Sequence, residues 1–352
     1  MVFDKSRSLR SITSRDVAKA ANVSQALVSR AFSGNGRIAP ETRNRILAIA
    51  EEIGWQPNAL ARSMVTGDAP LVAVITTRLH FDWRAQVLSH LLNTIQQWHL
   101  KPLLFYAESD DDVDRLLEET LSWRTRGVIV TAGIVQPRRA KAIVSRGQFL
   151  AALNRPAHHP NAFSVATDNL QGGAMAAALL LDEAGRDALV LSGRQGDWAS
   201  SLRTKGFVDA VAVRGGTARV WHNETMSTEA GKQCAAAYLD LPAGERPKAV
   251  FSTNDAMALG FMDGLRGQLS APSDFSLIGF DNLPSSSWTP YELTTFEQPL
   301  EEMVLRIVGY VNNHQQNAGR NFPAHNPERV AGDEIIYCAP KIVLRSTTKA
   351  KQ

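Results

Sequence analysis

The sequence predicts a small all-α helix-turn-helix headpiece, followed by an α/β body of two doubly wound parallel-sheet subdomains. Residues 14 to 33 have the spacing of two short helices that cross at a small residue, Ala18. After residue 70, short apolar runs alternate with helical stretches, which is typical of parallel sheets flanked by helices. Roughly nine such runs suit two doubly wound halves better than one sheet.

The composition is that of an ordinary globular chain. Of its 352 residues, 44% are hydrophobic and 21% are charged, which argues against disorder and coiled coil. No apolar run approaches the roughly 20 residues of a membrane span, and the first residues lack the apolar core of a signal peptide. We therefore expect a cytoplasmic protein that does not contact the membrane.

The sequence contains no motif of a catalytic or metal site. Cys234 and Cys338 lie far apart, which suggests neither a disulfide framework nor a Cys-based metal site. A Gly-x-Ser-x-Gly elbow, a Gly-x-x-x-x-Gly-Lys phosphate loop and a His-Glu-x-x-His zinc helix are all missing. His158 and His159 lack Cys or acidic partners at ligand spacing and are expected in a surface loop. We expect no enzyme activity, no cofactor and no metal.

Local signals mark the two helices of the helix-turn-helix. Thr13 and Asp16 form a capping-box-like pair before the first helix. Asn22 occupies a turn position that favours Gly, because Asn also tolerates a left-handed backbone. Ser24 then caps the second helix.

A third helix completes the predicted headpiece, residues 1–56. It should start at Pro40, which suits a first helical turn, and stop at Gly54. Ala39 stands where a capping Ser is usual, a change that should cost about 1 kcal/mol of helix stability.

The second helix presents a polar outer face. Its apolar residues turn inward, which leaves outward Ser24, Gln25, Ala26, Ser29 and Arg30. Such a face suits the major groove of DNA, where Arg prefers guanine and Gln prefers adenine. Residues 1 to 66 contain 10 Lys and Arg against 5 Asp and Glu, whereas the remainder contains 28 against 30. DNA binding needs that basic charge, although charge alone fits a merely solvated surface equally well.

Apolar runs in the body predict buried strands. They cover residues 71–75, 103–106, 127–130, 149–153, 188–191, 249–251 and 277–280. Apolar residues at helical spacing predict helices over 87–98 and 113–121. The stretch 312–326, rich in Asn, Gln and His, is expected to be an exposed loop.

Polar residues follow several of the predicted strands. They are Asn154-Arg155, Asp168-Asn169, Asn254-Asp255 and Asp281-Asn282, and Arg203 is expected to open a helix. Ligands of doubly wound folds bind where the carboxyl ends of strands meet. Taken singly, however, each of these residues fits a helix cap or a turn at least as well.

The sequence resembles the lactose-repressor (LacI/GalR) family of transcriptional regulators in a series of motifs, and the resemblance covers nearly the full length of the chain. The headpiece motifs are Asp16-Val17-Ala18, Val23-Ser24, Val28-Ser29-Arg30, Thr42-Arg43 and Pro57-Asn58-Ala59-Leu60-Ala61-Arg62-Ser63. The body adds Asn-Arg, Asp-Asn, Arg-x-x-Gly-Phe, Asn-Asp and Gly-Phe-Asp in the expected order. The resemblance implies a periplasmic-binding-protein-like pair of subdomains with a small-molecule effector in the cleft between them.

For DNA, the resemblance implies a set of contacts in the headpiece and the segment after it. Gln25 and Ala26 would discriminate operators and Arg30 would contact a base. Ser24, Ser29 and Ser33 would bind phosphates. Residues 57–69 would form a hinge helix and linker, with Asn58, Ala61 and Met64 at the DNA. Met64, where Leu is usual, would wedge into a central base step of the minor groove.

For the effector, the resemblance assigns residues 70–345 to an effector-binding and dimerisation domain. The strongest contacts would be Arg203, Asn254 and Asp281, followed by Asn154, Asp168 and Asp197. An aromatic wall would come from Phe81 and Trp83, in a segment that departs from the family's usual Asn-Pro-Phe-Tyr. Carboxylates and amides can bond ligand hydroxyls, and Arg203 can pair with a carboxylate or bridge two hydroxyls.

The sequence therefore predicts a ligand-responsive DNA-binding transcriptional regulator, expected to be a repressor. It would bind a near-palindromic operator as a homodimer or a tetramer. Its effector would be a sugar, polyol or sugar acid that changes DNA affinity. One alternative is a solute-binding protein for sugar transport, against which the headpiece argues. The other is an enzyme on a doubly wound fold, which lacks a nucleophile and a base.

Overall fold

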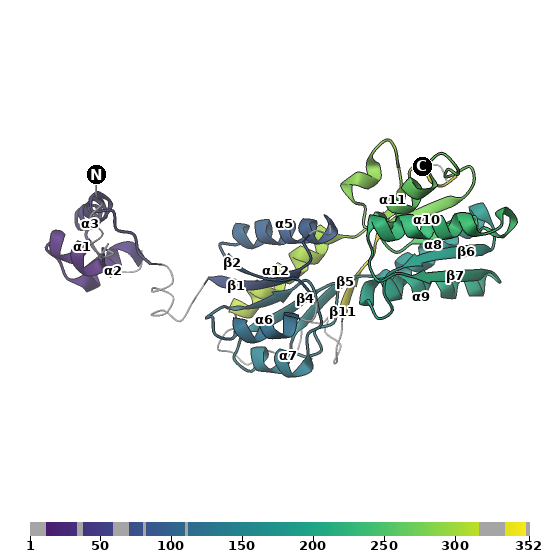
Figure 1. The fold of residues 1–352 in the computed structure, drawn as a ribbon. Coiled ribbons are helices and arrows are strands. Elements are labelled where there is room, and N and C mark those ends of the chain that lie inside the picture. The colour runs from purple at the N-terminus through teal and green to yellow at the C-terminus, as the bar shows by residue number, and fades with distance from the viewer. Residues whose placement is uncertain are drawn as a thin grey trace, which may run out of the picture. The chain divides into compact units, whose positions relative to one another are not determined.

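The computed structural model describes residues 12–33, 38–58, 70–79, 82–109, 112–316 and 335–349 (Figure 1). The chain forms two compact units, Met1–Ala69 and Pro70–Gln352. The first unit holds the headpiece helices, and the second holds both sheets.

Three helices pack around a small apolar core in the headpiece: α1 (Ser14–Ala20), α2 (Gln25–Ser33) and α3 (Pro40–Glu52). Val17, Val28 and Ile46, one from each helix, are fully buried. Beside them the Phe32 and Trp55 rings meet edge to face, with 5.0 Å between their centroids. Because so small a core buries little apolar area, the ends of its helices depend strongly on local caps.

The helix-end signals of the sequence are confirmed. The Asp16 carboxylate accepts hydrogen bonds from the Thr13 backbone N–H at 2.8 Å and from the Thr13 hydroxyl at 2.7 Å. Asn22 has a left-handed backbone with φ of 51°. The Ser24 hydroxyl accepts a hydrogen bond from the Leu27 N–H at 3.2 Å, which caps α2.

In the part of the chain that the structure describes, the body contains two six-stranded sheets, as the predicted fold class requires. The first has the order β11-β5-β4-β3-β1-β2 and is parallel. Its strands are β1 (Leu71–Thr77), β2 (Lys101–Ala107), β3 (Gly127–Val130), β4 (Phe149–Leu153), β5 (Phe163–Thr167) and β11 (Ile335–Cys338). One face packs on α5 (Asp82–Gln97) and α12 (Leu300–Gln316), and the other on α6 (Val113–Thr120) and α7 (Pro137–Val144).

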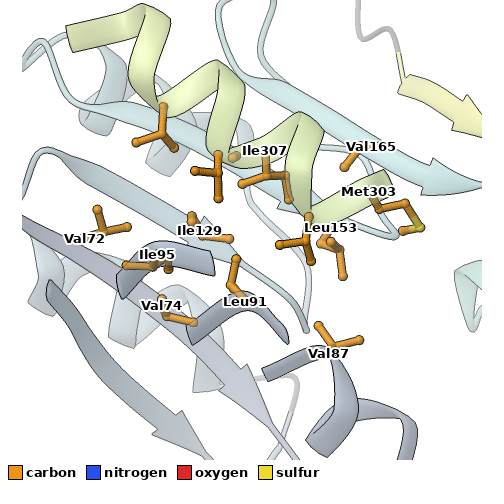
Figure 2. Packing of buried hydrophobic residues seen from close by; sticks show 14 of the residues in the cluster. Val72, Val74, Val87, Leu91, Ile95, Ile129, Leu153, Val165, Met303 and Ile307 are labelled. Carbon is orange, nitrogen blue, oxygen red and sulfur yellow. The ribbon is translucent and has the colours of Figure 1, made fainter. Parts of the chain in front are cut away.

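Alternating side chains of these strands supply the core on each face. In β1, Val72 and Val74 pack toward α5 and α12, while Ala73 and Ile75 point to α6 and α7. Figure 2 shows the first cluster, with Leu91 of α5 and Ile307 of α12 lying over the strands. Burial on both faces explains why the sequence of these strands is almost continuously apolar.

The second sheet has the order β12-β10-β9-β8-β6-β7, in which only the pairing of β10 with β12 is antiparallel. Its strands are β6 (Asp187–Ser192), β7 (Thr217–His222), β8 (Ala249–Ser252), β9 (Ser276–Phe280), β10 (Thr294–Glu297) and β12 (Lys341–Val343). The helices α8 (Asn169–Ala184) and α9 (Trp198–Val213) pack on one face. The helices α10 (Thr228–Asp240) and α11 (Asp255–Leu265) pack on the other.

The chain passes between the two subdomains three times. The passages run from β5 to α8, from β10 to α12 and from β11 to β12 (Figure 1). As a result, α12 and β11 complete the first subdomain although they follow the strands of the second. Side chains on the passages can therefore contact both subdomains.

Two glycines bring α8 and α9 into close contact. A Cβ added at Gly173 would overlap the backbone oxygen of Arg203, and one added at Gly206 would overlap that of Leu170. Only glycine permits the backbones to approach this far. The crossing therefore fixes the position of Arg203 from two sides.

Two expectations about helices are wrong. Arg203 does not open a helix, because α9 already begins at Trp198, where the Asp197 carboxylate caps it. Residues 312–316 do not form a loop, because α12 continues to Gln316. The apolar residues Val304, Val308 and Val311 of α12 continue at helical spacing and outweigh the polar composition that follows them. Residues 317–326 of that expected loop lie outside the described part of the chain.

Five strands have no counterpart among the expected apolar runs: β5, β7, β10, β11 and β12. The β7 strand lies at a sheet edge, where polar residues alternate with apolar ones. The β10 strand begins with two threonines, which are buried with their hydroxyls bonded. Neither strand has the continuous apolar run on which the expectation depended.

Candidate functional sites

The outer face of α2 is exposed as predicted. Ser24, Gln25, Ala26, Ser29 and Arg30 are all exposed, whereas Val28 between them is fully buried. The Arg30 Nε donates to the backbone oxygen of Ala26 at 3.4 Å. One short helix thus carries most of the predicted base and phosphate contacts on one surface.

The remaining predicted DNA contacts fall near or beyond the described headpiece. Asn58 is exposed at the end of the described segment. Ala61, Met64 and the predicted hinge helix lie outside the described residues, and so does the side chain of Ser33.

Arg203 lies at the centre of a buried polar cluster in the second subdomain. Its Nε donates to Asn169 Oδ1 at 2.8 Å, and its Nη1 donates to the backbone oxygen of Thr253 at 2.7 Å. Nη1 also lies 3.3 Å from Asp281 Oδ1, and the guanidinium carbon stands 3.7 Å from the centre of the Phe280 ring. Burial lowers the pKa of Arg203, and the Asp281 carboxylate opposes that effect.

Asp281 joins this cluster to the first subdomain through Gln298. Its Oδ1 accepts a hydrogen bond from Gln298 Nε2 at 2.7 Å. The Gln298 Oε1 accepts hydrogen bonds from Asn154 Nδ2 at 2.9 Å and from the Thr167 hydroxyl at 2.8 Å. Gln298 is 4% exposed and lies on the passage from β10 to α12. A single amide therefore bonds groups of both subdomains.

Asp281 has an unusual backbone conformation and a carboxyl group with a raised pKa. Its φ is 120°, in a region that non-glycine residues rarely adopt, and its N–H is held by the Phe296 oxygen at 2.8 Å. Burial raises the pKa of Asp281 to about 6, against the stabilising effects of Arg203 and Gln298. Strained, buried carboxyl groups of this kind concentrate at functional sites.

A second buried carboxylate, Asp255, supports the loop that follows β9. It accepts hydrogen bonds from the Leu283 N–H at 2.8 Å and from the Thr295 hydroxyl at 2.5 Å. Burial, followed by the nearby Asp281 charge, raises its pKa to about 7. Asp255 thus holds the residues that flank Asp281 and Asn282, through Leu283 and Thr295.

Three predicted effector contacts serve as helix caps. Asp168 accepts from the Gln171 N–H at the start of α8, and Asp197 caps α9. Asn254 caps α11 and also donates to the Met226 backbone oxygen at 2.9 Å. These bonds are those expected of helix-capping residues, and any ligand contact would use their remaining lone pairs and N–H groups.

Among the residues that the structure describes, the buried network includes neither of the two aromatic residues predicted to contact the effector. Trp83 is half-buried and packs against the apolar core of the first subdomain, beside Leu79. Phe81 lies outside the described residues. Of the predicted effector residues, the structure joins Asn154, Arg203 and Asp281 in one network.

Sequence reasoning missed Gln298, Asn169 and Thr253 as members of this network. Gln298 follows β10 directly, so the strand-end rule that found Asp281 would have found it had that strand been predicted. Asn169 is named with Asp168 at the end of a strand, but the resemblance assigns only Asp168 to the effector.

Two features are absent from the residues that the structure describes. Among them, no helix has both the length and the apolar character needed to cross a membrane. No group of three or more His, Cys, Asp or Glu side chains is placed to hold a metal ion.

Comparison with family models matches both units. Residues 13–58 match the model for "Bacterial regulatory proteins, lacI family", and residues 180–331 match the "Periplasmic binding protein-like domain". Together with the exposed α2 and the buried network, these matches define a DNA-binding transcriptional regulator that carries a ligand-binding domain. The chain belongs to the LacI family of bacterial regulatory proteins.

Known relatives extend the likeness over most of the chain. The HTH-type transcriptional regulator AscG of Escherichia coli (strain K12) is 27% identical over 84% of this chain and 90% of its own length. Catabolite control protein A of Priestia megaterium is 26% identical, covering 96% and 99%. The headpiece distinguishes all of these regulators from a solute-binding protein.

Solved structures show the same fold. A Lac repressor dimer bound to operator and the anti-inducer ONPF has a TM-score of 0.84 at 21% identity, covering 97% of this chain and 100% of that one. A complex of the transcriptional regulator CelR with cellobiose has a TM-score of 0.65 at 19% identity, covering 96% and 100%.

Proposed function

We propose that this protein is a transcription repressor that binds a near-palindromic operator as a homodimer and responds to a small polyhydroxylated effector. The observation that carries the proposal is the Gln298 amide, which bonds Asn154 and Thr167 of one subdomain and Asp281 of the other. A ligand that altered these bonds would act on both subdomains at once.

The proposed site lies between the subdomains, around Asn154, Arg203 and Asp281. The hydroxyls of a bound ligand would compete with Gln298 for the Asp281 carboxylate and for the Asn154 amide. Loss or exchange of those bonds would change the angle between the subdomains, and through it the placement of paired hinge helices. Such coupling requires that the effector bind the two arrangements with different affinities.

The charges in this site favour a neutral sugar or polyol over a sugar acid. Arg203 Nη1 already lies 3.3 Å from Asp281 Oδ1. A ligand carboxylate that paired with Arg203 would therefore have to displace the Asp281 carboxylate. Asp255 is a second buried acidic group, close enough for the Asp281 charge to raise its pKa. Neutral hydroxyls can donate to carboxylates and accept from Asn154 without adding negative charge.

The headpiece explains why a homodimer is proposed. One headpiece presents one α2, which spans a half-site in a major groove, and two-fold symmetric proteins read two-fold symmetric sites. The body carries the proposed effector contacts, including the further candidates Asn254, Asp168 and Asp197. Because a transcription regulator must reach the DNA that it regulates, the proposal implies a cytoplasmic protein.

The proposal is tested by deleting residues 1 to 66. Operator sequences would be selected from a random duplex library with the full chain, and a panel of sugars, polyols and sugar acids would be screened by thermal shift. We expect the deletion to abolish binding to the selected duplex and to leave the ligand-induced rise in Tm intact. Retained sequence-specific DNA binding by the shortened protein would overturn the proposed role of the headpiece.

A second arm tests the site. Asp281→Asn should abolish the ligand-induced shift, while Asp182→Asn, at an exposed position of α8, should leave it unchanged. An unchanged shift in the Asp281 variant would place the effector elsewhere.

A further inference from the structure

The side chains at the starts of α1 and α2 are joined by a hydrogen bond. Gln25 Nε2 donates to Ser14 Oγ at 2.8 Å, although the two residues are eleven positions apart in the chain. Each is the first residue of its helix. Gln25 is exposed on the outer face of α2, and Ser14 is half-buried.

Ser14 belongs to a helix that is held in place by the headpiece core. The helices α1 and α2 share a core in which Val17, Ala18 and Val28 are buried. The Ser14 hydroxyl, one turn before that core, therefore moves with the whole headpiece. A Gln side chain held to it has already lost much of the rotamer freedom that it would otherwise lose on binding.

The bond leaves the groups of Gln25 that read a base available. A primary amide has two N–H donors and one carbonyl acceptor, and Ser14 takes one donor. The remaining N–H and the oxygen are the pair that meets adenine N7 and N6 in the major groove. The neighbours of Gln25 offer less, because the Ser24 hydroxyl caps α2 and Ala26 has only a methyl group.

We propose that Ser14 is a specificity-determining positioning residue, which fixes the Gln25 amide so that α2 reads an adenine in each half of the operator. The proposal rests on the proposed function, since it requires that α2 enter the major groove. Ser14 itself need not touch a base. Its effect would be confined to one base pair, because it acts through Gln25 alone.

The experiment is a selection of duplexes from a random library by the full-length protein, followed by sequencing. Five proteins are compared: the wild type, Ser14→Ala, Ser14→Thr, Gln25→Ala and Ser145→Ala. Ser145 is an exposed serine of the body and serves as the matched control. Gln25→Ala identifies the base pair that Gln25 reads, as the one whose preference disappears.

At that base pair, Ser14→Ala should lower the preference for adenine by roughly two- to tenfold, the range expected for one hydrogen bond. Preferences elsewhere in the site should not change, and Ser14→Thr, which keeps a hydroxyl, should preserve the wild-type preference. The dependence of binding on salt should also be unchanged, because no phosphate contact is removed.

Three other results would overturn the proposal, for different reasons. If Gln25→Ala changes a preference and Ser14→Ala does not, the hydrogen bond only braces the two helices, and a fall in Tm would be its sole effect. If the wild type selects an operator but Gln25→Ala changes no base preference, Gln25 does not read the operator. If the wild type selects no symmetric site at all, the proposed function fails first.

Discussion

Replacing Gln298 by Met removes the amide that bonds both subdomains while nearly preserving the length of the side chain. Three buried hydrogen bonds are lost, two with the neutral partners Asn154 and Thr167 and one with the Asp281 carboxylate. A neutral bond contributes about 1 kcal/mol and a bond to a charged group about 2 kcal/mol, so we expect a loss of about 4 kcal/mol in the free energy of unfolding. Water entering the site would reduce that figure.

The assay is urea denaturation of the full chain followed by circular dichroism, with Gln148→Met as the matched control. The Gln148 amide also donates two hydrogen bonds at 3.0 Å, both to Thr125, but they stay within one subdomain and are only partly buried. We expect that variant to lose about 1 kcal/mol. If the Gln298 variant loses no more than the Gln148 variant, the buried network does not stabilise the body as we argue.

Other perturbations test the packing, the charges and the DNA surface. Gly206→Ala should destabilise the body by about 1 to 3 kcal/mol, because its Cβ would overlap a backbone oxygen of α8, whereas Gly244→Ala, with open space around it, should be nearly neutral in the same denaturation series. Burial raises the pKa of Asp281 to about 6 and that of Asp255 to about 7, so between about pH 4 and these values the folded state binds more protons than the unfolded chain. The free energy of unfolding should therefore fall as the pH rises from about 4 to about 7, by up to about 1.4 kcal/mol per pH unit for each group, and should level off above pH 7. Asp255→Asn should flatten the part of that profile between pH 6 and 7, and an unaltered slope would assign it to other groups. Arg30→Ala should cost about 1 to 3 kcal/mol of binding to the selected operator and relax discrimination at one guanine, as fluorescence anisotropy with single-base variants would show; an equal loss on every duplex would instead indicate a phosphate contact.

The headpiece could be predicted from its sequence because its determinants are local. Thr13 and Asp16 are three residues apart, and Asn22 and Ser24 act on their own neighbours. The same holds for β3 and β4, whose bounds agree with the expected runs because burial on both faces leaves no polar residue in either strand.

The network around Gln298 could be predicted only in part. Asn154 and Asp281 follow strands with clear apolar runs, and a general rule about strand ends finds them. Gln298 follows a strand that begins with two threonines, and those threonines suit a buried strand only because distant partners bond their hydroxyls. Such pairings across forty or more residues leave no periodic signal in the sequence. The expected start of α9 at Arg203 is wrong for a simpler reason: Asp197 is a residue type that caps helices, and the expectation assigns it only to the ligand.

The three passages between the subdomains also constrain how the body can fold. The first sheet is incomplete until β11 pairs with β5, and the helix that covers one of its faces, α12, is separated from β5 in the chain by almost the whole second subdomain. Contacts between such distant segments form late, because long loops must close first. A fragment ending after β5 would expose an apolar sheet face and an unpaired edge. We therefore expect the two subdomains to fold as a single unit, and we expect a chain cut between them not to yield two stable halves.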